Sequence, residues 1–170
     1  MMISTNIHEK INDLINKSAG KYIQVALGHE YYFTQTSEYN ETDISSFQKI
    51  IGYALPKQYS DFLIKVGACK LYFDKYELGI VFYKLEEIIS LMDSIFLDRN
   101  NPFPKLIIIG ANLNNGDSLG IDMTVKNNSN FSLFSPEEDP ESWIKDTKKN
   151  ITLNMFLEKI LCSYGEDYYL

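Results

Sequence analysis

The apolar residues of this chain change their spacing at Gly67, from a helical period to a strand period. Before Gly67 they recur every three or four residues, which is typical of amphipathic helices. One such stripe consists of Tyr59, Phe62, Leu63 and Val66. After Gly67 they first alternate with polar residues, which is typical of half-buried strands. Helices followed by a largely antiparallel sheet, with one helix inside it and one after it, predict an α+β fold rather than a regular βαβ winding.

Five segments have the apolar period and the end signals of helices. The predicted helices cover 4–19, 43–51, 56–66, 84–97 and 153–164. The expected N-terminal caps are Ser4 for the first, Thr42 or Asp43 for the second and Thr152 for the last. Such side chains accept a hydrogen bond from a free amide of the first helical turn. Pro56 suits the first position of the third helix because the N–H that proline lacks would be unpaired there.

The strand signals lie mainly between and after these helices. Strands are predicted over 70–73 and 78–83 around a polar turn, over 106–109, over 118–123 after a turn at 114–117, over 131–134 and, shorter, near 31–33. In the strand over 118–123, one face is expected to carry Leu119, Ile121 and Met123, and the other Ser118, Gly120 and Asp122. A chain of 170 residues is long enough to bury one sizeable core, so we expect a single domain.

The charge balance limits the kinds of partner. The chain has 23 Asp and Glu against 16 Lys and Arg, a formal net charge of −7, and its one arginine is Arg99. Binding to a nucleic-acid backbone needs a basic surface, so we expect no direct nucleic-acid binding, whereas a basic protein partner is compatible with the charge. The first apolar stretch contains Glu9, Lys10, Asp13 and Lys17. We therefore expect no secretory signal, no membrane span and a cytoplasmic location.

No residue pattern predicts a catalytic, metal or cofactor site. Cys69 and Cys162 are far apart in the sequence, and His8 and His29 have no metal-ligand spacing, so solvated or locally packed histidines are expected. The segment 110–117 is glycine-bounded like a phosphate loop, but it lacks the following Lys-Ser or Lys-Thr pair and helix, so a hairpin turn explains it better. An enzyme whose carboxylates come together only in the fold stays open as an alternative.

Two blocks of residues resemble the signature of a known family. In the first block the matching positions are Gly52, Leu55, Pro56, Tyr59, Phe62, Leu63 and Gly67. Departures from the signature occur at Gln48, Ile51 and Val66, where it has an acidic residue, a leucine and an asparagine. The second block, over 108–122, contains the pairs Ile109-Gly110, Gly116-Asp117 and Ile121-Asp122. By these blocks, and by the terminal helix around Phe156, the chain resembles the SUKH superfamily, also called the SMI-KNR family, over about 40–162.

The resemblance implies a single α+β domain with a curved, mostly antiparallel sheet flanked by helices. Within it, 1–39 would form an N-terminal helix and lead-in, packed as one domain with a SUKH-like part over 40–170. The resemblance also implies a non-catalytic immunity protein that binds and neutralises a cognate polymorphic or contact-dependent bacterial toxin, such as a nuclease with a basic surface. A regulatory or scaffold domain of the cell-wall assembly type stays open as the alternative. No oligomeric state is implied.

Candidate partner-binding residues follow from charge and from strand geometry. The matched glycines, Pro56 and the matched apolar residues serve folding, so specificity is expected to reside in exposed residues. Exposed carboxylates at turns and on the outward side of a strand suit a basic partner. The candidates are Asp74, Glu77, Asp117, Asp122, Glu137 and Glu138.

Overall fold

The computed structural model describes residues 6–95, 105–123, 131–135, 138–139, 142–143 and 151–166. Over these residues the chain forms, in order, α1 (Ile7–Ser18), β1 (Ile23–Ala26), β2 (His29–Ser37), α2 (Glu41–Ile51), α3 (Lys57–Lys65), β3 (Ala68–Phe73), β4 (Ile80–Phe82), α4 (Leu85–Ile95), β5 (Leu106–Asn112), β6 (Asp117–Asp122), β7 (Phe131–Phe134) and α5 (Leu153–Cys162). The predicted α+β class is therefore confirmed.

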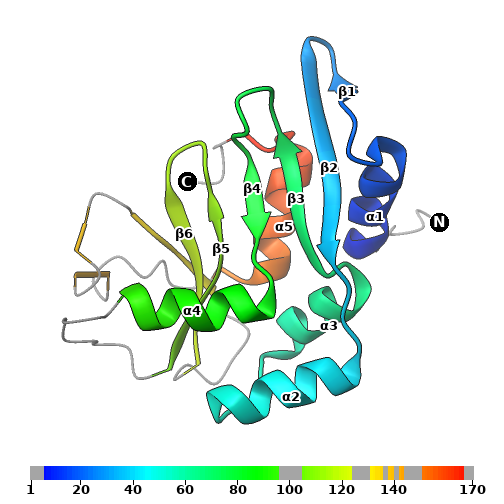
Figure 1. Cartoon of the computed structure of the whole chain (residues 1–170). Helices are drawn as coiled ribbons and strands as arrows, with labels where there is room; N and C mark the ends of the chain where they lie inside the picture. The colour runs from blue at the N-terminus through cyan, green and yellow to red at the C-terminus, as the bar shows by residue number, and fades with distance from the viewer. Residues whose placement is uncertain are drawn as a thin grey trace.

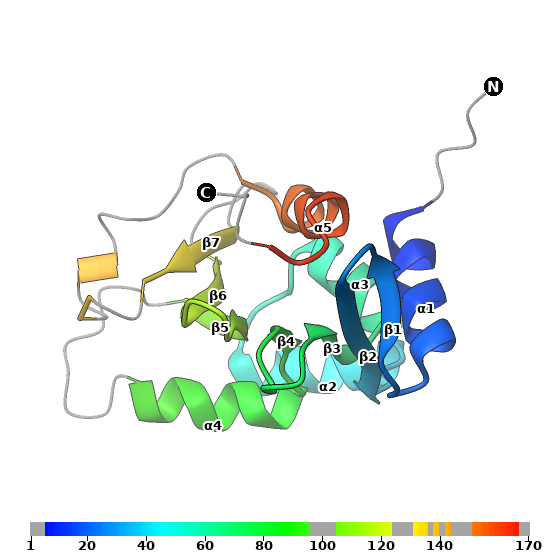
Figure 2. The same cartoon turned by 90° about the horizontal axis from the view of Figure 1, so that it is seen from above.

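The seven strands form one open sheet in which spatial order equals chain order, from β1 to β7 (Figure 1). Every neighbouring pair is antiparallel. Viewed from above, the strands follow an arc whose concave side faces α5 (Figure 2). This geometry confirms the predicted curved, antiparallel sheet.

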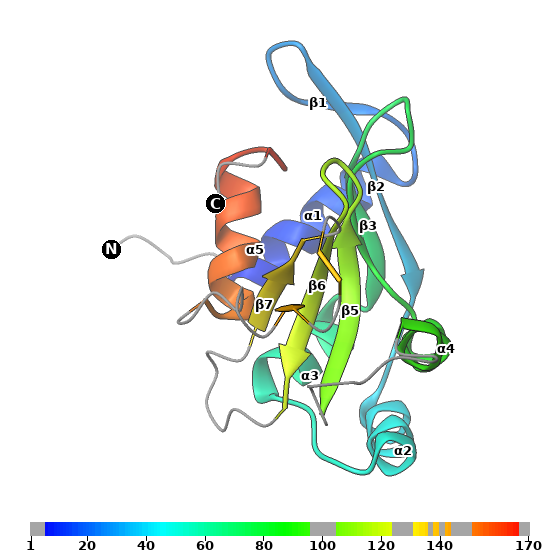
Figure 3. The same cartoon turned by 90° about the vertical axis from the view of Figure 1, so that its left-hand side faces the viewer.

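Helices cover both faces of the sheet, with α5 on one side and α4 on the other (Figure 3). On the α5 side, α1 packs against β2 and α5, and α3 packs against α5. The inner strand β5 is buried at all seven positions because it has apolar neighbours on both faces. Ile107 and Ile109 join the main core, whereas Leu106 and Ile108 pack with Phe134 and Trp143 in a second cluster next to α4. A continuous apolar run is typical of a strand covered on both faces.

The helix caps differ in part from the predicted ones. The side chain of Asn6 caps α1 by accepting from the amide of His8, and Ser4 lies outside the described residues. Asn40 caps α2, and Asp43 completes a capping box by accepting from the Asn40 amide, so the expected Thr42 or Asp43 cap was wrong. Pro56 precedes the first helical residue of α3 and does not occupy it. Thr152 caps α5 as predicted.

The N-terminal hairpin is larger than the sequence pattern indicates. Sequence alone predicts a short strand near 31–33, whereas the structure has a nine-residue β2 paired with β1. The hydroxyl of Ser18 accepts from the amide of Phe33 at 2.8 Å, and the amide of Gly20 donates to the Phe33 carbonyl at 3.2 Å. These bonds fix β2 against the end of α1. Tertiary contacts of this kind give no signal in a periodicity analysis.

Two motif glycines, Gly52 and Gly67, allow a matched test of the fold. Both have φ of 84°, which glycine adopts without strain. A Cβ at Gly52 would meet no atom within 4 Å, whereas a Cβ at Gly67 would overlap the carbonyl oxygen of Ser37. Gly52→Ala is expected to cost about 1–2 kcal/mol for the left-handed backbone alone. Gly67→Ala should cost a further ~1–3 kcal/mol for overpacking. Urea unfolding followed by circular dichroism measures both, and equal losses would contradict the clash.

His8 is a buried histidine, only 6% exposed, and its ring faces Phe62 at 6.3 Å between centroids. Neither ring nitrogen has a hydrogen-bond partner among the described residues. Burial, and then the charge of Lys65, lower the pKa of His8 below 6.5, while Asp61 opposes them. A buried imidazole without partners favours the neutral form because the charged form would lose its hydration.

The lowered pKa of His8 predicts a pH dependence of stability. The unfolded chain binds this proton more strongly than the folded one, so His8 disfavours the folded state as the pH falls through 6.5. One such proton contributes a slope of at most about 1.4 kcal/mol per pH unit. His8→Phe should therefore lose less free energy of unfolding than the wild type between pH 7.5 and pH 5.5. His29→Gln removes the other, half-exposed imidazole as the control. An unchanged slope in His8→Phe would refute this assignment.

Candidate functional site

Three turns of the sheet lie at the same one of its ends, which we call the turn end (Figure 1). They are the β1–β2 turn at 27–28, the β3–β4 turn at 74–79 and the β5–β6 turn at 113–116. The residues 163–166 that follow α5 lie beside them, because Gly165 and Glu166 line a hollow together with Asp74 and Asn114. The amide of Leu113 donates to the carbonyl of Gly79 at 2.8 Å, which joins two of the turns.

The structure brings three of the six predicted partner-binding residues together. Asp74 and Glu77 lie in the β3–β4 turn, and Asp117 is the first residue of β6, directly after the β5–β6 turn. Asp122 is the last residue of β6 and pairs with Leu106 at the opposite end of the sheet. Its charge there adds to burial in raising the pKa of Tyr53.

The last two predicted residues belong to the acidic segment after β7. Glu138 is exposed and accepts from the hydroxyl of Ser142 at 3.2 Å. Glu137 lies outside the described residues. Of the predicted residues that the structure describes, only Asp74, Glu77 and Asp117 therefore lie at the turn end, where one partner could contact all three.

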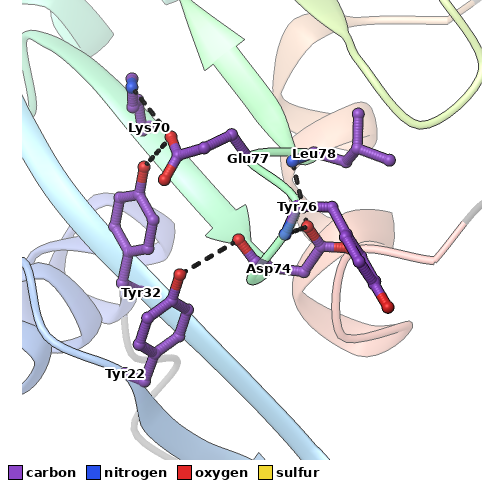
Figure 4. Close-up of polar contacts among 7 residues, drawn as sticks. All are labelled: Tyr22, Tyr32, Lys70, Asp74, Tyr76, Glu77 and Leu78. Carbon is purple, nitrogen blue, oxygen red and sulfur yellow. Dashed lines mark hydrogen bonds and ion pairs between the residues drawn. The ribbon is translucent and has the colours of Figure 1, made fainter.

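Asp74 organises the β3–β4 turn through its side chain (Figure 4). One carboxylate oxygen accepts from the amides of Tyr76 and Leu78 at 2.8 and 3.1 Å. The hydroxyl of Tyr22, the residue before β1, donates to the backbone carbonyl of Asp74 at 3.3 Å. Aspartate favours such turns because its short side chain reaches amides two and four residues ahead. Asp74 is thus both a charge and the acceptor that holds the turn.

Glu77 connects the same turn to β2 (Figure 4). Its carboxylate accepts from the hydroxyl of Tyr32 at 2.6 Å and lies 3.6 Å from the ammonium of Lys70. Burial and this hydrogen bond raise the pKa of Tyr32, which keeps the hydroxyl a donor at physiological pH. Glu77 also has a positive φ of 60°, which is uncommon for a residue other than glycine. The carboxylate is therefore held in a defined position.

Two adjoining hollows lie between the turns. The larger, of about 630 Å³, separates the β1–β2 hairpin from the β3–β4 turn and is lined by residues that include Gln24, His29 and Tyr76. The smaller, of about 220 Å³, is lined by residues that include Tyr72 and Glu166. Tyr31 and Asp74 line both hollows. The hollows therefore form one surface with aromatic walls and acidic edges.

Carboxylates dominate the electrostatics of the smaller hollow. Burial, and then the charges of Glu166 and Asp74, raise the pKa of Tyr31. His29 lies 3.7 Å from Glu166 and 3.4 Å from the Tyr31 hydroxyl. This arrangement can attract a cation.

Sequence reasoning did not single out the aromatic residues of the turn end. Tyr59 and Tyr72 are buried in the core, whereas Tyr22, Tyr76 and Tyr164 are exposed. A signal existed for Tyr76, because an aromatic residue inside a polar turn cannot reach the core. Tyr164 carried no such signal, since its exposure depends on where α5 ends.

The two cysteines lie in different environments. Burial raises the pKa of the Cys69 thiol, and Cys162 is exposed and not in a disulfide. In the part of the chain that the structure describes, no three His, Cys, Asp or Glu side chains are placed to hold a metal ion. None of the helices in those residues is long and apolar enough to cross a membrane.

The two roles of Asp74 predict different effects of two substitutions. Asp74→Asn keeps a side-chain oxygen that can accept from the Tyr76 and Leu78 amides, so the free energy of unfolding should change by less than about 0.5 kcal/mol. Asp74→Ala loses both hydrogen bonds and should cost about 1–2 kcal/mol. Urea unfolding of the two variants measures the difference. Equal stabilities would show that the carboxylate does not hold the turn.

Comparison with known proteins identifies the family of this chain. The immunity protein RhsIB of Dickeya dadantii (strain 3937) is 27% identical over 142 residues, which are 83% of this chain and 85% of that protein. The SMI1/KNR4 family (SUKH-1) matches residues 38–159, more than two thirds of the chain. The matched span contains the β3–β4 and β5–β6 turns, and the β1–β2 hairpin precedes it. The chain therefore belongs to the SMI1/KNR4 family (SUKH-1), as its sequence motifs predicted.

Proposed function

We propose that this chain is a non-catalytic immunity protein, which binds a cognate bacterial toxin in the cytoplasm and neutralises it by occluding its active site. The observation that carries the proposal is the similarity to an immunity protein over most of both chains. Membership of the SMI1/KNR4 family supports it. Occlusion needs only a complementary surface on a stable scaffold and no catalytic group, which agrees with a site made of turns.

The charge of the chain favours a basic toxin. A net charge of −7 and the carboxylates at the turn end would attract a positively charged surface and increase the association rate. Enzymes that act on nucleic acids carry such surfaces because they bind phosphates. We therefore propose a nuclease as the toxin.

Within the proposed interface, Asp74, Glu77 and Asp117 form the main acidic group. Asp122 and Glu138 would contribute only through a second contact area, since Asp122 lies at the other end of β6. Glu137 is proposed together with Glu138 on sequence grounds alone. Their removal should affect binding less than removal of the charges at the turn end.

Co-expression tests the proposed function. The toxin domain encoded nearest to this gene is expressed in a sensitive host, with this chain or with an unrelated acidic protein as the control. We expect growth to be restored only by this chain, because inhibition needs a specific complex. Co-purification with an inactivated form of the toxin should then yield that complex. Absence of both rescue and complex would refute the immunity function, and a complex with an endogenous cell-wall protein would favour the regulatory alternative.

A further inference from the structure

The exposed apolar side chains of this protein are unevenly distributed. Among the described residues, the large exposed apolar side chains are Tyr22, Leu27, Ile50, Ile64, Tyr76, Leu78, Leu113, Met155 and Tyr164. Ile50, Ile64 and Met155 lie singly on α2, α3 and α5. The other six belong to the turns and chain segments at the turn end, and we call them the turn-end patch. Single exposed apolar residues are ordinary, but a cluster marks an interaction site.

The turn-end patch is assembled only by the fold. Its residues come from the position before β1, the three turns and the segment after α5, which are separated by up to about 140 positions in the sequence. Leu27 is 94% exposed at the tip of the β1–β2 hairpin, and Tyr76 is 70% exposed in the β3–β4 turn. Burying such side chains in a complex removes large apolar areas from water.

Several residues of the patch are already held in place. Tyr22 is fixed by its hydrogen bond to Asp74 and by an edge-to-face contact with Tyr32 at 5.5 Å (Figure 4). Tyr76 lies in the turn that the Asp74 carboxylate holds. Tyr164 has a positive φ of 54° beside the end of α5. Aromatic side chains that are ordered before binding lose little conformational entropy in the complex, which favours affinity.

Carboxylates surround the turn-end patch and limit the kinds of partner that can bind it. They are Glu30, Asp74, Glu77, Asp117 and Glu166, and Lys70 and Lys75 offset part of their charge. A second copy of this chain would oppose its own carboxylates to these, which is unfavourable. Nucleic acids and anionic membranes carry the same sign of charge and are disfavoured as well. The remaining occupant is a protein surface with an apolar centre and basic edges.

The smaller hollow gives this occupant a specific anchor. The rings of Tyr31 and Tyr72 lie edge to face at 5.6 Å, and Asp74 and Glu166 line the same 220 Å³ hollow. A lysine or arginine side chain fits such a place, because its stem packs on aromatic rings while its charged end reaches carboxylates. Hot spots of protein interfaces often combine such a pocket with nearby apolar contacts.

We infer that the partner binds across the turn-end patch with a basic-edged apolar surface, and inserts a lysine or arginine into the hollow between Tyr31, Tyr72, Asp74 and Glu166. This inference rests on the proposed function and adds to it the position of the interface and the chemistry of the partner. The centre of this interface is apolar and the carboxylates of this chain form its edge. The sequence motifs indicated only the charged residues.

The test uses three double variants and the inactivated toxin domain encoded nearest to this gene. The patch variant is Leu27→Ser/Tyr76→Ser. The charge variant is Asp74→Asn/Glu77→Gln, in which both new side chains can keep the hydrogen bonds of the turn. The control variant is Ile50→Ser/Ile64→Ser, which removes exposed apolar side chains elsewhere. Circular dichroism and urea midpoints first establish that each variant is folded.

We expect the patch variant to raise the dissociation constant at least 30-fold, mainly through faster dissociation, and to abolish growth rescue. The charge variant should slow association up to about tenfold and weaken its dependence on salt. It should also speed dissociation, because Asp74 lines the hollow that receives the cation. The control variant should bind within twofold of the wild type. A single Glu166→Gln should weaken binding by several-fold if the hollow takes a cation.

The outcomes separate the two proposals. A wild type that binds, with a patch variant that binds equally well, would overturn the turn-end interface and leave the immunity function standing. The same holds if only the control variant loses binding. A wild type that neither binds nor rescues growth would overturn both. Loss of binding in the patch variant, with binding retained by the control variant, supports the inference.

Discussion

The burial of β5 on both faces is the constraint on which the rest of this structure depends. The run Leu106–Ile109 has no polar position, so neither face of the strand can meet water at low cost. The main core, with α1, α3 and α5, covers one face, and the cluster around Trp143 and α4 covers the other. A sheet with one exposed face would leave half of this apolar run in water. The helices on both sides follow from this requirement, although they are far apart in the sequence.

The order of the strands then determines which turns share one end of the sheet. Because each strand pairs antiparallel with its neighbour in the chain, alternate turns must lie at the same end of the sheet. The hairpin tip, the Asp74 turn and the β5–β6 turn therefore converge without any long-range sequence signal. Side chains within these turns stabilise them locally, as the carboxylates of Asp74 and Glu77 illustrate. The core and the turns at this end are thus stabilised by largely different contacts, apolar packing in the core and side-chain hydrogen bonds in the turns.

Much of this architecture could be predicted from the sequence, because the apolar period and the turn residues after Gly67 are clear. The β1–β2 hairpin was underestimated because it is fixed by bonds from Ser18 and Gly20. The capping residues were misplaced because Asn40 competes with Thr42 and Asp43, and only geometry selects among them. The division between 1–39 and 40–170 stays a prediction.

The candidate site was predictable in its charges but not in its apolar part. Turn positions identified Asp74, Glu77 and Asp117, whereas the separation of Asp122 requires the direction and order of the strands. The exposure of Leu27 and Tyr164 depends on how far a hairpin projects and where a helix ends. Neither property is encoded in local residue patterns.

The convergence of the turns at one end has a consequence for how such proteins can diversify. A turn can change its length or sequence without shifting the strand register or opening the core, since the paired residues lie outside it. The protein resembles in this respect an antibody domain, whose variable loops are carried by a conserved framework. Substitutions at a few turn positions could therefore change the binding specificity of such a chain. Selection for folding would act mainly on other residues, those of the strands and the core.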